Sequence, residues 1–244
     1  MYDAGWVANH DGNLSARVSE ARILCTATGK SKADIGTDEL LVVNGDGQRI
    51  SGRARPFSEL KLHLAVYRLR PKAMAVVHAH PPYATAFGAS GVQLPHPFLP
   101  EAVVSIGASI PTVPLSAPGA PAVEALAPYL LGHDAVLIAG NGVLTWGPTL
   151  ELAFLRMELV EHIAKIAHFA LPLGGVKLLP DAMVEVLLDK RRSAGLATPE
   201  ERRGAPQNHP TIEAATQRVL ARLPGASKTE VLRLAEASLD RHRS

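Results

Sequence analysis

The sequence predicts an α/β protein, in which short apolar segments with strand character alternate with segments of helical periodicity. Residues 40–43 and 49–50 flank residues 44–47, whose sequence Asn-Gly-Asp-Gly is typical of a β-hairpin turn. Residues 134–146 contain two more apolar strands around a Gly-Asn-Gly turn. Residues 150–170 then carry apolar side chains at the spacing of an amphipathic helix.

Composition and charge exclude several classes of protein. The chain has 244 residues, of which 47% are hydrophobic and 20% charged, as in ordinary globular proteins. A net charge of +2 with mixed signs gives no reason to expect a nucleic-acid or membrane partner. The sequence has no stretch of about 20 apolar residues, and its single cysteine, Cys25, rules out an internal disulfide. We expect a soluble, cytoplasmic protein in a reducing compartment.

The N-terminal segment predicts a loop, a strand and a second loop. Residues 11–17 are small and polar, residues 23–25 are apolar, and residues 26–30 are again small and polar. The Gly12-Asn13 pair, followed by hydroxyl side chains, suits a turn whose backbone N–H groups face an anion. Most turns of this composition bind nothing, so both interpretations stay open.

A helix is predicted to begin near residue 58. Ser58 is a natural N-cap, and Leu60, Leu64 and Tyr67 fall at helical spacing before a proline ends the segment. Glu59 stands in the first turn, where a carboxylate complements the helix dipole. That electrostatic role is the alternative to a chemical role for Glu59.

Two histidines stand at the end of a predicted buried strand. Residues 74–77 are four apolar residues in a row, which suits a strand covered on both faces, and a Pro-Pro pair after His80 ends it. Side chains two residues apart on a strand point to the same side, so His78 and His80 share a face. Two neutral imidazoles on one face make half a metal site. The alternative is that one histidine packs in the core and the other is solvated.

The next segment, residues 91–121, is rich in proline and glycine. It contains an apolar strand at residues 110–115, preceded by His96 and Glu101, and residues 121–131 are predicted to form a helix.

The long helix at residues 150–170 carries apolar residues along one face, and His162 and His168 on this helix are interpreted as ordinary surface or core histidines. The residues of that face are Ala153, Met157, Val160, Ala164 and Ala167.

The C-terminal part, residues 173–244, is interpreted as a helical extension. Residues 181–192 predict one helix, a polar linker follows, and residues 211–223 and 228–241 predict two more amphipathic helices. The arginine and lysine clusters near the linker are interpreted as solvated surface. We expect the extension to cover a subunit boundary or the mouth of an active site.

The order of these segments resembles the class II aldolase/adducin family over residues 5 to 170. The family includes L-fuculose-phosphate aldolase, L-ribulose-5-phosphate 4-epimerase and methylthioribulose-phosphate dehydratase. No single motif is specific, but five in this order and spacing are. The matching segments are residues 12–15 with Arg17, residues 28–29, residues 58–59, residues 77–81 and residues 139–144.

The resemblance implies a three-layer α/β/α fold with a mostly antiparallel central sheet over residues 1–172. It implies a homotetramer with active sites between subunits, and a divalent metal, zinc in most members, held by His78 and His80. Glu59 would act as base or metal ligand, and Glu101, after a proline-rich loop, as general acid or base from the opposite side of the site. The residues expected to bind the substrate or its anionic group are Gly12, Asn13, Thr28, Gly29 and Ser58.

This chain departs from the family pattern at several positions. The third metal-binding histidine of the family is replaced by Asn141, and an amide oxygen would favour manganese, magnesium or iron more than a three-histidine site does. A serine that precedes Ser58 in the phospho-sugar enzymes is Phe57 here. The helix that usually comes first is absent, because the glycine-asparagine turn already stands at residue 12; either the start is annotated late or the fold is trimmed.

The expected function is a metal-dependent lyase that cleaves a C–C bond next to a carbonyl through a metal-stabilised enediolate. Its substrate would be a small hydroxy-carbonyl compound or hydroxy acid. One alternative is a decarboxylase of a hydroxylated aromatic acid, in which Phe57 stacks on the substrate ring. A second alternative is a non-catalytic, adducin-like assembly domain, which the loss of a metal ligand at residue 141 would favour.

Overall fold

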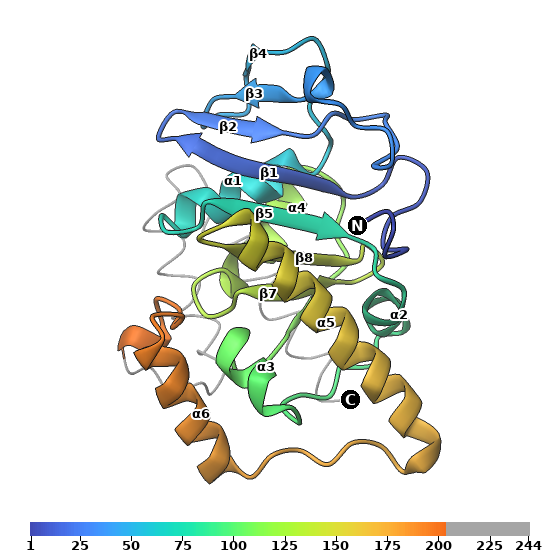
Figure 1. The fold of residues 1–244 in the computed structure, drawn as a ribbon, viewed down its shortest axis with the longest axis vertical. Coiled ribbons are helices and arrows are strands. Elements are labelled where there is room, and N and C mark those ends of the chain that lie inside the picture. The colour runs from blue at the N-terminus through green and yellow to red at the C-terminus, as the bar shows by residue number, and fades with distance from the viewer. Residues whose placement is uncertain (204–244) are drawn as a thin grey trace.

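The computed structural model describes residues 1–203, which fold around one central β-sheet with helices on both faces (Figure 1). Eight strands of this part of the chain lie in the order β4-β3-β2-β1-β5-β8-β7-β6. Every neighbouring pair is antiparallel except β6 and β7, which are parallel. The strands are β1 (Asn13–Ser19), β2 (Arg22–Cys25), β3 (Leu41–Val43), β4 (Arg49–Ser51), β5 (Ala75–Ala79), β6 (Thr112–Val113), β7 (Ala135–Ile138) and β8 (Val143–Gly147).

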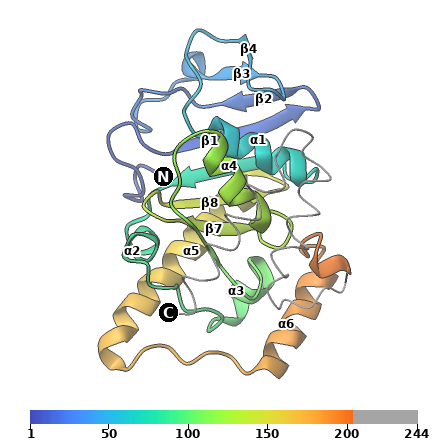
Figure 2. The ribbon, with the colours of Figure 1, turned by 180° about the vertical axis from the view of Figure 1, so that it is seen from behind.

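The two faces of the sheet support two separate hydrophobic cores, as the alternation along β5 illustrates. Val76 packs into the core beneath α1 (Leu60–Leu69) and α4 (Ala120–Leu126), which Figure 2 shows over one face. Val77 packs into the core of α2 (Pro82–Ser90) and α5 (Leu150–Ala170) on the other face (Figure 1). The predicted three-layer α/β/α arrangement is therefore confirmed.

Several elements agree with the sequence-based prediction. β3 and β4 form the predicted hairpin, and β7 and β8 are the two predicted strands around the Gly-Asn-Gly turn. α5 has the predicted bounds, and all five residues of its predicted apolar face are buried. His162 and His168 are both exposed on this helix.

Other elements correct the prediction. Residues 13–17 are strand β1, not a loop, because the hydroxyl of Ser15 is satisfied inside the core, where it hydrogen-bonds His63 Nδ1 at 2.7 Å and the Tyr67 hydroxyl at 2.8 Å. Ser58 does not cap α1: the N-cap position is taken by Glu59, and no side chain caps that end.

The segment that follows β5 is more helical than predicted. The Pro-Pro pair ends β5 and also opens α2, because proline fits the first turn of a helix. A further short helix, α3 (Pro100–Ser105), precedes β6, which is shorter than the strand predicted at residues 110–115. The helix predicted at residues 121–131 is shorter as well, because α4 ends at Leu126 and a 3-10 turn follows it.

The C-terminal region begins with α6 (Asp181–Ser193), which confirms the helix predicted at residues 181–192. Leu187 and Leu188 of this helix pack against Val103 of α3, so the first part of the extension shares a core with the rest of the fold. The division at residue 172 stays a prediction. The helices predicted at residues 211–223 and 228–241 lie outside the described residues. Within residues 1–203, every helix is too short or too polar to cross a bilayer.

Candidate active site

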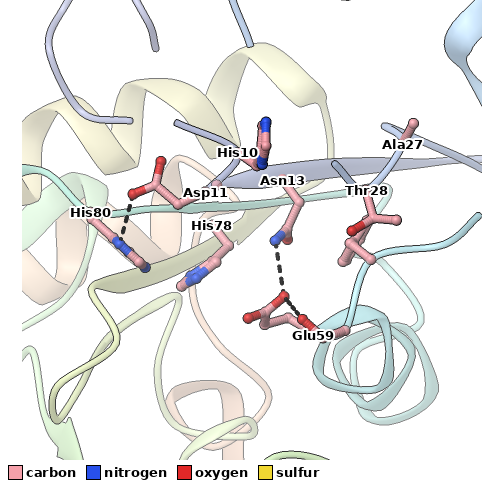
Figure 3. Close-up of a pocket in the computed structure, with 11 residues that line it drawn as sticks. His10, Asp11, Asn13, Ala27, Thr28, Glu59, His78 and His80 are labelled. Carbon is pink, nitrogen blue, oxygen red and sulfur yellow. Dashed lines mark hydrogen bonds and ion pairs between the residues drawn. The ribbon is translucent and has the colours of Figure 1, made fainter. Parts of the chain in front are cut away.

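A cavity of about 170 Å³ opens where β1 begins and β5 ends (Figure 3). It brings together four parts of the chain: the turn before β1, the loop after β2, the start of α1, and the end of β5 with its two histidines. The residues that line it are His10, Asp11, Gly12, Asn13, Ala27, Thr28, Phe57, Ser58, Glu59, His78 and His80.

Strand geometry gives the two histidines a common side, as predicted. β5 pairs with β1 so that His78 lies opposite Asn13, and His80 follows directly after the last residue of the strand. The two imidazole centroids are 5.1 Å apart with the rings nearly perpendicular. His78 is 1% exposed, whereas the side chain of His80 is 30% exposed at the mouth of the cavity.

Hydrogen bonds fix the proton on each ring. Nδ1 of His78 lies 3.0 Å from the carbonyl oxygen of Val143, which can only accept, so we assign the proton to Nδ1. Nδ1 of His80 lies 3.0 Å from Oδ2 of Asp11, which assigns the proton in the same way. In the neutral rings both Nε2 atoms then carry a free lone pair. Nε2 of His80 is buried and has no hydrogen-bond partner among the residues that the structure describes.

Burial keeps His78 neutral. Loss of solvent around the ring, and then the nearby His80, lower the pKa of His78 to about 4. At neutral pH the ring is therefore in the form that a metal ion requires.

Glu59 faces the same cavity from the start of α1, and its carboxylate is half-buried. The Ser58 hydroxyl donates a hydrogen bond to Oε2 of Glu59 at 2.7 Å, and the side-chain amide of Asn13 donates to the same oxygen at 3.4 Å. The two donors hold the carboxylate in place, and a carboxylate so placed is a candidate general base. Figure 3 shows His78 between His80 and Glu59.

The turn predicted to bind an anion lines the cavity. Gly12, Asn13, Thr28 and Ser58 all border it, whereas Gly29 does not. Gly12 has a φ of +68°, and a Cβ there would lie 2.4 Å from Cγ1 of Val7 and 3.2 Å from the backbone oxygen of His78 in β5, so this tightly packed turn requires glycine.

Asn141 does not line the histidine cavity. It borders a second, more apolar cavity of about 280 Å³ that shares Ser58 and Glu59 with the first. The turn that carries it nevertheless touches His80, because a Cβ at Gly142 would lie 2.4 Å from Cδ2 of that ring. Within residues 1–203, no three His, Cys, Asp or Glu side chains gather as a metal-binding group. The role of Asn141 as a ligand stays a prediction.

Glu101 is exposed in the first turn of α3 and borders neither cavity of its own chain. The structure therefore does not bring it to the predicted site within one subunit.

Sequence reasoning missed Asp11 and His10, which both line the histidine cavity. Residues 11–17 were interpreted as a loop, so no partner for a ring nitrogen was sought there. A carboxylate directly before a Gly-Asn turn was the available signal, but its pairing with His80 depends on β1 lying beside β5.

The two histidines fit part of a divalent-metal site. Each presents an imidazole nitrogen with its other nitrogen already bonded, which is the arrangement that metal-bound histidines require. The buried, unpartnered Nε2 of His80 is the observation that supports this fit.

Comparison with known proteins identifies the family. The profile of the Class II Aldolase and Adducin N-terminal domain matches residues 1–168. This chain belongs to the class II aldolase and adducin family. The predicted resemblance is thereby confirmed.

Individual members of the family are similar over most of their length. The chain is 32% identical over 192 residues to 3-oxo-tetronate 4-phosphate decarboxylase of Haemophilus influenzae, covering 77% of this chain and 90% of that protein. It is 31% identical to L-fuculose phosphate aldolase of Methanococcus vannielii, covering 70% and 91%. A solved structure of L-fuculose 1-phosphate aldolase superposes with a TM-score of 0.72 at 27% identity, covering 78% of this chain and 90% of that one.

Proposed function

We propose that this class II aldolase family member is a divalent-metal-dependent carbon–carbon lyase that acts on a small, anionic hydroxy-carbonyl substrate. The observation that carries the proposal is the shared cavity. It contains two imidazole nitrogens free to bind a cation, the carboxylate of Glu59 and the turn at Gly12.

His78 and His80 would hold the metal, through the Nε2 atom of each ring. A bound divalent cation would supply Lewis-acid stabilisation of the negative charge that develops on a carbonyl oxygen when the adjacent C–C bond breaks. Zinc is the metal that we propose. Manganese, magnesium and iron are the alternatives, because Asn141 stands where a three-histidine site has its third imidazole.

Glu59 would move the proton. In an aldol cleavage a base removes the proton of the hydroxyl group next to the breaking bond, and the aldehyde leaves as its C=O forms. Glu59 lines the cavity, and its carboxylate accepts hydrogen bonds from two donors, Ser58 and Asn13, which orient it for this role. The acid that results can then return a proton to the carbanion carbon, which completes the cycle.

Decarboxylation of a 3-oxo acid is the second candidate reaction. It places an electron pair on the carbon next to the carbonyl, as aldol cleavage does, but releases CO₂ instead of an aldehyde. It is favoured by the relatives named 3-oxo-tetronate 4-phosphate decarboxylase, which include the protein of Haemophilus influenzae.

The aromatic-acid variant is less well supported, because Phe57 offers little surface for stacking. Its side chain is 6% exposed and belongs to the core beneath α1. The ring lies 4.9 Å from the ring of His63 in an edge contact. We therefore propose an aliphatic substrate with a phosphate or carboxylate group, for which the turn at Gly12 and Thr28 provides the contact.

The proposal also covers the location of the protein, its oligomeric state and the role of Glu101. We infer a cytoplasmic homotetramer in which Glu101, which borders neither cavity of its own chain, acts as general acid or base in the site of a neighbouring subunit.

The proposal is tested by assaying the full-length protein, loaded with zinc or manganese, on a ketose 1-phosphate and on a 3-oxo-acid phosphate. Aldehyde release supports aldol cleavage and CO₂ release supports decarboxylation. Glu59→Gln should lower kcat at least about 100-fold, the usual contribution of a general acid or base. Glu158→Gln, an exposed carboxylate on α5, is the matched control. Absence of both products, or an unchanged rate in Glu59→Gln, would contradict the proposal.

A further inference from the structure

We propose that Asp11 is the positioning residue for His80: its carboxylate holds the proton of the imidazole on Nδ1 and thereby keeps Nε2 free to bind a metal. The inference rests on the proposed metal site, in which His80 is one of two ligands. It adds a residue that the family motifs quoted above do not contain.

Both oxygens of the Asp11 carboxylate are used. Oδ1 accepts the backbone N–H of Ala8 at 2.5 Å, and Oδ2 lies 3.0 Å from Nδ1 of His80. The backbone N–H of His80 donates to the carbonyl of Trp6 at 2.9 Å, so the segment before β1 is attached to His80 at two points. Figure 3 shows the carboxylate of Asp11 directed at the ring of His80.

Both hydrogen-bond partners of the Asp11 side chain are donors, so this side chain must offer two acceptor oxygens. An ionised aspartate provides two acceptor oxygens, whereas an asparagine of the same size provides one oxygen and an NH₂ group. If that NH₂ group faces the ring, Nδ1 must act as the acceptor and the proton moves to Nε2. If it faces Ala8 instead, two N–H groups oppose each other and the backbone donor loses its partner.

The position of His80 in the fold explains why it needs a side-chain partner. His78 lies within β5 and finds a backbone carbonyl, that of Val143 on β8, for its Nδ1 proton. His80 stands one residue beyond the strand, where its recorded Nδ1 partner is the carboxylate of Asp11. A carboxylate that orients a metal-binding histidine in this way typically contributes roughly 10–100-fold to metal affinity.

The experiment measures the tautomer directly in the metal-free, full-length protein. Long-range ¹H–¹⁵N NMR spectra of ¹⁵N-histidine-labelled protein at about pH 8, above the usual histidine pKa, distinguish a proton on Nδ1 from one on Nε2. The chain has 10 histidines, so the spectrum of His80→Gln assigns the signals of His80.

We expect the proton of His80 on Nδ1 in the wild type and on Nε2 in Asp11→Asn. Zinc affinity, measured by competition with a chelator, should fall roughly 10–100-fold in Asp11→Asn. Asp11→Glu, which keeps two acceptors, should restore the wild-type tautomer and most of the affinity. Asp3→Asn, an exposed aspartate in the same N-terminal segment, should change neither measurement.

A proton that stays on Nδ1 in Asp11→Asn would overturn the inference, and so would a tautomer that changes without loss of zinc affinity. Failure of the wild type to bind zinc, manganese, magnesium or iron would instead contradict the proposed function, because the tautomer is measured without metal.

Discussion

For His78 and His80, some features could be predicted from the local sequence and others could not. The common side of His78 and His80 follows from the two-residue period of a strand and could be predicted from residues 74–80 alone. The proton positions could not, because they depend on Val143 and Asp11, which come from a distant strand and from a turn. The local pattern thus predicts the ligands, whereas long-range pairing decides how they are oriented.

Asn141 offers a test of the missing third ligand. Its turn touches His80 through Gly142, and the cavity that it lines meets the histidine cavity at Glu59. Asn141→His should place a third imidazole beside the other two and raise zinc affinity at least about tenfold, the lower end of the effect of such changes. Chelator competition measures the affinity, with Ser116→His, on the far wall of the second cavity, as the control. Equal affinity in wild type and Asn141→His would show that the turn does not reach the metal.

The buried ring of His63 makes the stability of the fold depend on pH. The ring is fully buried, and burial, followed by the charge of His78, holds the pKa of His63 well below its ordinary range. In the unfolded chain the ring takes up a proton below about pH 6.5, whereas the folded chain does not, so stability falls as the pH decreases through that value.

The expected loss is about 1.4 kcal/mol per pH unit for each histidine kept neutral in this way. His78 and His96, whose pKa values are also lowered, contribute in the same direction. Urea unfolding at about pH 7.5 and 5.5 should therefore show a loss of stability in the wild type that is smaller by roughly 1.4 kcal/mol in His63→Gln. An identical loss in both proteins would mean that His63 is protonated in the folded state.

At the scale of elements, one buried arginine links helix α6 to the rest of the fold, in addition to the apolar contact of Leu187 and Leu188 with Val103. Arg191 is 0% exposed and contacts the carboxylates of Asp134 and Glu201. It also donates to the backbone carbonyls of Val104 and Ser105. The side chain of the neighbouring Arg192 pairs with Asp189, three residues earlier on the same helix, and is 41% exposed.

This pair of arginines gives a matched test of what anchors the extension. Arg191→Met should destabilise the protein by about 3–5 kcal/mol, because it removes one member of a buried charge network together with its hydrogen bonds to the carbonyls of Val104 and Ser105. Arg192→Met should cost less than about 1 kcal/mol, as expected for an exposed ion pair. Chemical denaturation of both variants measures the difference. Similar losses in the two would show that α6 is held by its apolar residues instead.

The elements differ in how well they could be predicted, for a different physical reason in each case. α5 was predicted with its bounds because its apolar period continues through 21 residues. β1 was missed because its buried Ser15 looks like a loop residue until His63 and Tyr67 of α1 supply hydrogen bonds. α2 was missed because the Pro-Pro pair was interpreted only as the end of a strand, although proline also opens helices.

At the scale of the whole molecule, two cavities share Glu59 in their linings, and the second cavity is the more apolar of the two. The histidine cavity is bordered by the turn before β1, and the second cavity lies between α1, α4 and the turn after β7. The family could be predicted from the order of short motifs, and the layers followed from that resemblance. The separation of Asn141 from the histidine cavity was not predictable, since it depends on how the turn after β7 packs against the end of β5.

The central claim is that His78 and His80 hold a divalent metal in the cavity that contains Glu59. The most direct measurement is the metal content of the purified full-length protein after equilibrium dialysis against zinc or manganese, compared with a His78→Gln/His80→Gln variant. His162→Gln/His168→Gln, which removes two exposed histidines of α5, is the control. We predict one metal ion per chain in the wild type and the control, and loss of this ion in the His78→Gln/His80→Gln variant. Equal metal content in all three proteins, or none in the wild type, would contradict the claim.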